Sequence, residues 1–262
     1  VDQLRPAWQV ESWRGPPLLR MLHFGEPFVY KKYDESIEHC HARGFQVFIS
    51  TNPSVWTETR IEQTLETGLD ELLVMMDGMD DETSMAIRGR VASFVRGEKN
   101  LLELAARKAA RGLDRPRITV GMIKQPRNRH QWELFKTRWQ GVAGIDAVYL
   151  AHYSTFGGDI PEINALEDRL AGEDPAQAAQ VRRQKALASY PCYYPWHSVS
   201  VAWDGKVVPC CRDYDAKLVL GDLNKQTLED IWNGPALRSL RSEFKTGRLV
   251  SDLCRKCKEP SL

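Results

Sequence analysis

The chain has 262 residues, of which 42% are hydrophobic and 27% are charged, and its formal net charge at pH 7 is +1. This length supports one large or two modest domains with a buried core, and the balanced charge argues against a nucleic-acid partner. No apolar run approaches the roughly 18 residues of a membrane span, so no membrane partner is expected. The N-terminus does not resemble a secretion signal, and the six cysteines therefore indicate a reducing, cytoplasmic setting, where cysteines more often bind metals or act in catalysis than form disulfides.

The first 155 or so residues alternate between apolar runs and amphipathic stretches. The apolar runs predict five strands, at Leu18–Phe24, Phe45–Ser50, Glu71–Met76, Ile118–Ile123 and Ala147–Ala151. Helices are predicted between them, at about 33–43, 57–67, 98–112 and 128–141, and Gly44, Gly68 and Gly112 follow three of these. Continuous apolar runs are typical of strands buried on both faces of a parallel sheet. The sequence therefore predicts an α/β sheet or barrel with too few strands for a closed eight-stranded barrel.

The character of the chain changes after this region. We expect a first domain over 1–158, a linker with helix over 159–189, and a small C-terminal module over 190–262. In that module Asp204-Gly205 predicts a type I′ hairpin turn, and Thr227 to Asp230 resembles a capping box. Gly234-Pro235 ends one short helix and begins another. A hairpin with two short helices has too small a core to be stable alone, so it needs an additional cross-link such as a metal centre.

Four cysteines in this module are candidate ligands for one metal centre: Cys192, Cys210, Cys254 and Cys257. The last two form a CxxC, whose thiolates can converge on one centre. Thiolates select zinc, Cu(I) or iron–sulfur clusters, and the spacing alone does not separate zinc from iron–sulfur. Cys211 is expected to be a buried thiol that points away from the site, and Cys40 is expected to have a packing or surface role.

Residues 190–257 resemble the SPASM/twitch domain found at the C-terminus of radical S-adenosylmethionine (SAM) enzymes. The resemblance is carried by Cys192, the Asp204-Gly205 hairpin, Pro209-Cys210, Leu220-Gly221-Asp222, Leu228 to Asn233, Arg238 and the final CxxC. One form of this domain holds a single auxiliary [4Fe–4S] cluster on four cysteines. The resemblance implies that these are Cys192, Cys210, Cys254 and Cys257, and the likeness extends to the twitch-type dehydrogenases of aminocyclitol pathways.

The N-terminal half resembles the remainder of a radical SAM barrel, because the predicted strand ends carry family-like motifs. His23-Phe24-Gly25-Glu26-Pro27 is similar to the motif that contacts the amino group of SAM. The resemblance implies a cofactor-binding set at the ends of three strands: Gly25, Glu26, Pro27, Asn52, Asp77 and Arg88. His152, at the end of the last predicted strand, is a candidate proton acceptor.

One departure from the family is large. The CxxxCxxC motif that follows the first strand of radical SAM enzymes is absent from these 262 residues. The expected fold is therefore a partial (β/α)6 barrel without its first strand, joined to a small cluster-binding domain. The chain as given is not expected to cleave SAM, since SAM and a second [4Fe–4S] cluster are expected only together with the missing segment.

The resemblance implies a radical SAM enzyme that abstracts hydrogen from a small-molecule substrate, with a two-electron alcohol oxidation as a possible outcome. An external electron donor such as flavodoxin or ferredoxin is the expected protein partner. Two alternatives stay open. One is a radical SAM maturase that acts on a peptide, and the other is a non-catalytic Cys₄ zinc scaffold, which applies if the chain is full length.

Overall fold

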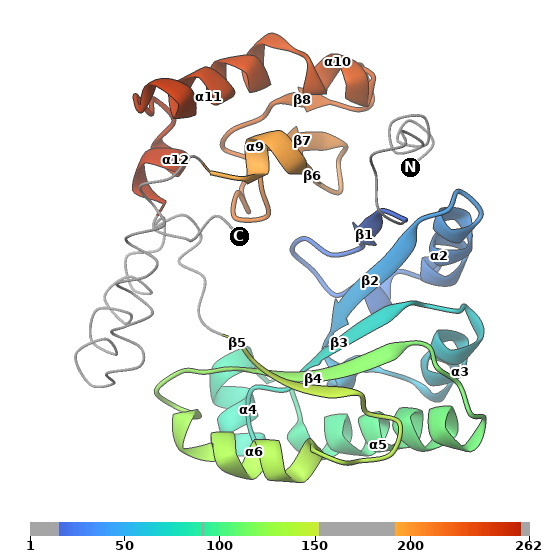
Figure 1. Cartoon of the computed structure of the whole chain (residues 1–262). Coiled ribbons are helices and arrows are strands. Elements are labelled where there is room, and N and C mark those ends of the chain that lie inside the picture. The colour runs from blue at the N-terminus through green and yellow to red at the C-terminus, as the bar shows by residue number, and fades with distance from the viewer. Residues whose placement is uncertain (1–15, 91, 152–191, 258–262) are drawn as a thin grey trace. The chain divides into compact units, whose positions relative to one another are not determined.

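The computed structural model describes residues 16–90, 92–151 and 192–257, which Figure 1 draws in colour. The chain divides into two compact units, Val1–His152 and Tyr153–Leu262, and each is described by itself. The boundaries predicted at residues 158 and 189 lie outside the described residues and stay predictions. No helix in the described part of the chain combines the length and apolar character needed to cross a membrane.

The first unit is built on a five-stranded parallel sheet whose strands follow one another in chain order. They are β1 (Leu18–Arg20), β2 (Gln46–Thr51), β3 (Glu71–Met75), β4 (Arg117–Ile123) and β5 (Ala147–Ala151). Every neighbouring pair is parallel, as when Leu72 of β3 pairs with Ile118 of β4. The predicted parallel α/β sheet is confirmed. The first strand is shorter than predicted, because the chain leaves the sheet after Arg20 to form the loop that carries Gly25.

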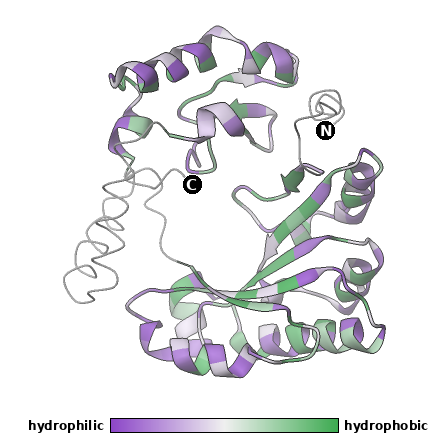
Figure 2. Cartoon of the chain, in the orientation of Figure 1, coloured by the Kyte–Doolittle hydropathy of each residue, from purple (hydrophilic) through white to green (hydrophobic). Residues whose placement is uncertain are grey.

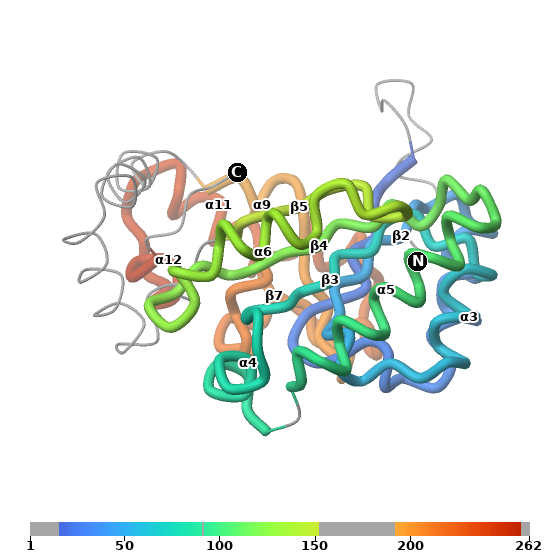
Figure 3. The backbone as a smooth tube through the Cα atoms, turned by 90° about the horizontal axis from the view of Figure 1, so that it is seen from below, coloured from blue at the N-terminus to red at the C-terminus, as the bar shows by residue number. Residues whose placement is uncertain are grey.

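Helices connect the strands. The longer ones are α2 (Tyr33–His41), α3 (Glu58–Glu66), α4 (Asp81–Arg88), α5 (Phe94–Ala110) and α6 (Trp132–Trp139), with short 3-10 turns at η1 (Pro27–Val29), η2 (Pro53–Val55) and η3 (Arg129–Gln131). Gly44, Gly68 and Gly112 all have positive φ just past their helices, as predicted. α5 begins earlier than predicted, because Ser93 caps it by accepting a hydrogen bond from the amide of Arg96. In Figure 1 α5 and α6 lie beneath β4, and Figure 3 views the chain from that side.

The core of this unit lies between the sheet and its helices. Val47 and Ile49 of β2, Val74 of β3, and Ile118 and Val120 of β4 are fully buried there. The prediction that these strands are buried on both faces is wrong. In β2 buried and half-buried residues alternate, and Tyr149 of β5 is 50% exposed, because the described helices pack on one face of the sheet. Figure 2 shows the apolar strands against helices that are polar outside.

The second unit combines a small antiparallel sheet with short helices. Its elements are α9 (Tyr194–His197), β6 (Ser200–Val201), β7 (Lys206–Val208), β8 (Gly221–Asp222), α10 (Leu228–Trp232), α11 (Pro235–Thr246) and α12 (Asp252–Lys256). The sheet order is β6-β7-β8, and the third strand was not expected from the sequence. Its core contains Val207, Leu220, Ile231, Leu237 and Leu240, against which Cys254 packs. The predicted hairpin and two-helix arrangement is confirmed, with α9 and α12 in addition.

The hairpin turn differs from the predicted type. The amide of Gly205 donates to the carbonyl of Ala202, which closes a four-residue turn, and Gly205 has a φ of 87°. A type I′ turn needs positive φ at both central residues, and among the described residues Ala216 is the only non-glycine with positive φ. The turn is therefore of the type I kind followed by a left-handed glycine, and the type I′ prediction is wrong.

The capping box before α10 is confirmed. The hydroxyl of Thr227 accepts from the amide of Asp230 at 3.1 Å, and the carboxylate of Asp230 accepts from the amide of Thr227 at 3.2 Å. Pro235 then stands at the start of α11, as predicted. These local signals position α10 and α11 against the small sheet.

Candidate cofactor and cluster sites

The loop after β1 is tied to the end of β2 by one carboxylate. Glu26 accepts a hydrogen bond from the hydroxyl of Thr51 at 2.5 Å and another from the amide of Asn52 at 2.9 Å. It also accepts from the amide of Phe28 at 3.1 Å and thereby caps η1. Gly25 before it has a φ of 143°, a conformation that favours glycine. Three protein donors thus already order this carboxylate, and the loop keeps Gly25, Glu26 and Pro27 beside Asn52.

Asn52 and its neighbour Thr51 continue this network. The side-chain oxygen of Asn52 accepts from the amide of Ser54 at 2.9 Å and caps η2. The indole of Trp56 donates to the hydroxyl of Thr51 at 3.0 Å. These contacts make the end of β2 rigid. The turns η1 and η2 and the buried ring of Trp56 are all held by side chains of Glu26, Thr51 and Asn52.

At the end of β3 a buried ion pair joins two further predicted residues. The guanidinium of Arg88 lies 2.7 Å from the carboxylate of Asp77, which is only 3% exposed. The other oxygen of Asp77 accepts from the amide of Ile123 at 2.7 Å, which links the pair to the end of β4. The sequence did not predict a role for Asn128, whose buried side chain donates to the carbonyls of both Asp77 and Ile123 at 2.9 Å. The side-chain oxygen of Asn128 accepts from the nearby amide of Gln125 at 2.8 Å, whereas the contact with Asp77 depends on tertiary structure.

Three of the predicted cofactor residues share one small cavity of about 10 Å³, which has room for about one water molecule. Its lining consists of Asn52, Ser54, Met75, Met76, Asp77, Ser84, Arg88, Ala92, Ser93 and Phe94. The structure thus brings Asn52, Asp77 and Arg88 together, and Glu26 joins them through Asn52. His152 lies outside the described residues. A larger cavity of about 290 Å³ lies near the start of β5 and contains none of these residues.

The four candidate cysteines lie on three segments of the second unit, with Cys254 and Cys257 on the same one. Cys192 precedes α9, Cys210 follows β7, Cys254 is in α12 and Cys257 ends α12. Burial raises the pKa of the Cys254 thiol to about 12, and the charges of Cys210, Cys192 and Cys257 add to this effect. These charges place the four candidate cysteines in one neighbourhood of the second unit, without the close convergence of side chains around a metal ion.

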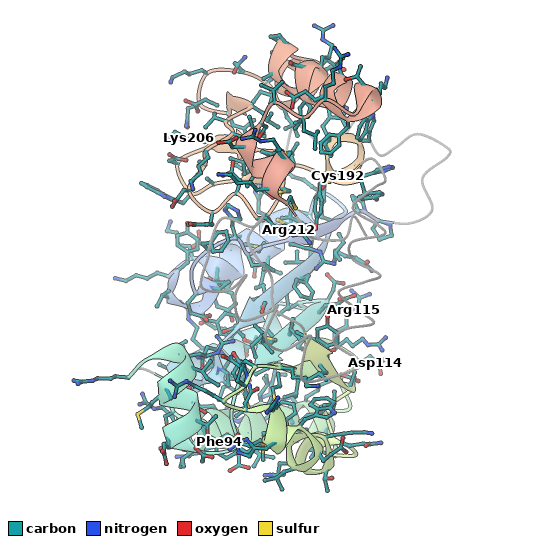
Figure 4. All side chains as sticks on the ribbon, turned by 90° about the vertical axis from the view of Figure 1, so that its left-hand side faces the viewer. Phe94, Asp114, Arg115, Cys192, Lys206 and Arg212 are labelled. Atoms are coloured by element: carbon teal, nitrogen blue, oxygen red, sulfur yellow. The ribbon has the colours of Figure 1, made fainter. Side chains whose placement is uncertain are left out.

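The pKa shifts of Cys210 and Cys192 agree with a shared thiol site. Burial raises the pKa of Cys210 to about 12, and burial also raises that of Cys192. The positive charge of Arg212 lowers the pKa of both thiols and so opposes both shifts. Figure 4 labels Arg212 and Cys192. Among the described residues, no group of three or more His, Cys, Asp or Glu side chains is arranged to hold a metal ion. The donor chemistry, four thiols with a guanidinium beside them, fits a cluster that takes four thiolates.

The two other cysteines differ from this set. Cys40 is buried in α2, in agreement with a packing role. Cys211 is exposed, with its sulfur 3.8 Å from the hydroxyl of Tyr194, so the prediction of a buried thiol is wrong. The chain turns away from the small sheet after Val208, and the strand alternation behind that prediction does not reach Cys211.

Comparison with known families identifies the second unit. Residues 192–258 match the SPASM family, described as an iron-sulfur cluster-binding domain.

The chain is 23% identical over 268 residues to the tungsten-containing aldehyde ferredoxin oxidoreductase cofactor-modifying protein of Pyrococcus furiosus, a match that covers 92% of this chain and 74% of that protein. It is 35% identical over 80 residues to the S-adenosyl-L-methionine-dependent 2-deoxy-scyllo-inosamine dehydrogenase of Niallia circulans, covering 30% of this chain and 32% of that one. It is 24% identical to the PqqA peptide cyclase of Xanthomonas axonopodis, covering 90% of this chain and 66% of that protein.

Solved structures support the fold. The crystal structure of BtrN in complex with AdoMet and 2-DOIA matches with a TM-score of 0.54 at 21% identity, covering 98% of this chain and 76% of that one. The predicted resemblance to radical SAM enzymes with a SPASM domain is confirmed, as is the α/β fold class with a small C-terminal unit. The SPASM match also indicates that the C-terminal unit binds an iron–sulfur cluster.

Proposed function

We propose that this chain belongs to a radical SAM enzyme that carries one auxiliary [4Fe–4S] cluster and oxidises an alcohol group of a small-molecule substrate. The observation that carries the proposal is the match of residues 192–258 to the SPASM iron–sulfur domain, within which all four candidate cysteines lie. Cys192, Cys210, Cys254 and Cys257 would hold the cluster. SAM, cleaved with an electron from the second cluster expected with the missing segment, would supply the radical that removes a hydrogen atom, and the auxiliary cluster would take the remaining electron as the substrate loses a proton.

The residues of the first unit would bind and orient SAM. Glu26 is held rigid by three donors, and a rigid carboxylate at a strand end suits an ammonium group of the cofactor. Asp77 and Arg88 form a buried pair that fixes the ends of β3 and β4 at the same level. Ligands of parallel sheets bind at this carboxyl end, which supports the same placement. An external one-electron carrier such as ferredoxin or flavodoxin would exchange electrons with the cluster.

A second candidate function is supported by one comparison. The PqqA peptide cyclase of Xanthomonas axonopodis aligns with 90% of this chain, whereas the dehydrogenase of Niallia circulans aligns with 30% of it at higher identity. A peptide is therefore the alternative substrate. Incubation of the complete enzyme with SAM and either aminocyclitols or candidate peptides would separate the two, since a keto product and a modified peptide differ in mass.

The cluster assignment has a direct test. We expect anaerobically purified protein to contain about four irons and four sulfides per chain, as four cysteines hold a [4Fe–4S] cluster. Cys254→Ala should lose most of this iron. Cys40→Ala is the matched control and should keep it, because Cys40 is buried in α2 of the first unit. One zinc per chain without sulfide would contradict the proposal and support the zinc scaffold, and iron loss in Cys40→Ala would mean that the ligands are misassigned.

A further inference from the structure

Helix α11 presents one cation to the segment that carries Cys192. Nε of Arg241 donates to the carbonyl of Pro195 at 2.8 Å, and Nη1 donates to the carbonyl of Trp232 at 2.9 Å. The guanidinium also lies 4.4 Å from the centre of the Trp232 ring, within cation–π range. One side chain of α11 therefore connects the segment after Cys192 with the end of α10.

A ring contact reinforces this connection. Pro195 and Trp196 both lie in α9, directly after Cys192 and Tyr193. The ring of Trp196 meets that of Phe244, one turn along α11 from Arg241, with 6.0 Å between centroids. α9 has only four residues and cannot hold its own position, so its place depends on these contacts.

The same helix also holds the segment that carries Cys254 and Cys257. The carboxylate of Glu243 accepts from the amides of Val250 at 2.8 Å and Ser251 at 3.2 Å. Ser251 is the residue before α12, which carries Cys254 and ends at Cys257. α11 itself is anchored in the core through Leu237 and Leu240. Two charged residues of one helix thus fasten two different cysteine segments.

We propose that Arg241 is a positioning residue for the cluster site, which holds the Cys192 segment at a fixed place on α11. The inference rests on the proposed cluster function for its biological meaning, but the contact itself belongs to the chain alone. A lysine is not an equivalent replacement, because its ammonium lacks the planar fork that donates to two carbonyls and stacks on an indole. Without the guanidinium of Arg241, α9 loses its hydrogen bond to α11, while the contacts of Glu243 keep α12 in place.

Residue-resolved alkylation of the metal-free protein tests this directly. Iodoacetamide labelling followed by peptide mapping gives a separate rate for Cys192 and Cys254. In Arg241→Met we expect the rate at Cys192 to rise on the order of tenfold or more, since the two hydrogen bonds to the carbonyls of Pro195 and Trp232 are lost from the closed state. The rate at Cys254 should stay within about twofold of the wild type, because its tether is Glu243. Arg241→Lys should behave like Arg241→Met.

Control variants make the outcome decisive. Lys245→Met removes an exposed cation from the same helix and should change neither rate. Equal increases at Cys192 and Cys254 in Arg241→Met would mean general loosening and would overturn the proposal, as would an unchanged Cys192. Glu243→Gln should show the reverse pattern, with Cys254 more reactive than Cys192.

A second readout links the inference to the cluster. If the wild type holds iron, Arg241→Met should lose iron and alter the electron paramagnetic resonance spectrum of the reduced cluster, while Lys245→Met keeps both. Full iron and an unchanged spectrum in Arg241→Met would overturn the positioning role and leave the proposed function intact. A wild type without iron would overturn the proposed function, and the alkylation pattern would still decide the role of Arg241.

Discussion

The carboxylate of Glu26 and the backbone amide of Asn52 lie 2.9 Å apart, although the two residues follow different strands. The other oxygen of Glu26 accepts from Thr51 and Phe28. This carboxylate therefore joins the loop after β1 to the end of β2, and any cofactor group that approaches it meets an acceptor whose position is already set.

Glu26→Gln should destabilise the first unit. A glutamine amide has one acceptor oxygen, and its NH₂ group would face at least one backbone or hydroxyl donor. We expect a loss of about 1–3 kcal/mol in the free energy of unfolding, measured by urea titration. Glu38→Gln, on the exposed side of α2, is the control and should change stability by less than about 0.5 kcal/mol. Equal stability of the two variants would show that the carboxylate does not hold the strand ends together.

Arg88→Met should be more damaging, because it leaves the buried carboxylate of Asp77 without its cation. Removing one partner of a buried ion pair lowers the free energy of unfolding. Because Arg88 is partly exposed, we expect a loss of about 3 kcal/mol, near the lower end of the usual range for such pairs. The double variant Asp77→Asn with Arg88→Met should recover part of the loss, which thermal or urea unfolding would show. A double variant no more stable than Arg88→Met would contradict the view that an unpaired charge causes the defect.

The second unit should lose part of its stability in acid through Asp222. A hydrogen bond from Lys225 and the amide of Asn224 lower the pKa of Asp222 to about 2. Because the folded pKa lies below the unfolded value, the contribution is complete above about pH 4 and is lost as the pH falls towards about 2. The difference in unfolding midpoint between the wild type and Asp222→Asn should therefore shrink over that range. A difference that stays constant from pH 5 to pH 2 would show that the Asp222 charge plays no part.

Thr227→Ala removes the hydroxyl of the capping box before α10. We expect it to destabilise the second unit by about 1 kcal/mol in denaturant unfolding, since the amide of Asp230 loses its acceptor. Thr227→Ser keeps an equivalent hydroxyl and should retain most of the stability. If serine and alanine are equally destabilising, the effect comes from the lost methyl group rather than from the cap.

Elements with a local signal were predicted well, and those that depend on distant partners were not. β5 has its predicted bounds, because an apolar run is bracketed by polar residues, and Thr227 marked the start of α10. α4 is an exception: it was missed although Asp80 caps it, Asp81 and Glu82 lie in its first turn and Gly89 follows it, because with only Ser84 buried it lacks a buried apolar stripe. Its ends are fixed by Asp80, which caps it, and by Arg88, which pairs with Asp77.

The candidate sites follow the same division. The sequence pattern named the four thiols as candidates and the resemblance assigned them to an iron–sulfur cluster, whereas their influence on one another is a result of tertiary structure. Asn128 could not have been found, because it bridges carbonyls that end two different strands. The exposure of Cys211 was misjudged for a related reason: the strand alternation used to place it ends at Val208.

The strand order of the first unit has a consequence for how the protein is made. Each strand pairs with the one that precedes it in the chain, as when Leu18 pairs with Gln46 and Phe48 with Glu71. No strand of the described sheet must wait for a partner synthesised several units later. The sheet can therefore grow one strand and one helix at a time during translation, with each new strand adding to an edge that is already folded. Between successive additions that growing edge is unpaired, and this is the stage at which the nascent chain is most exposed to aggregation.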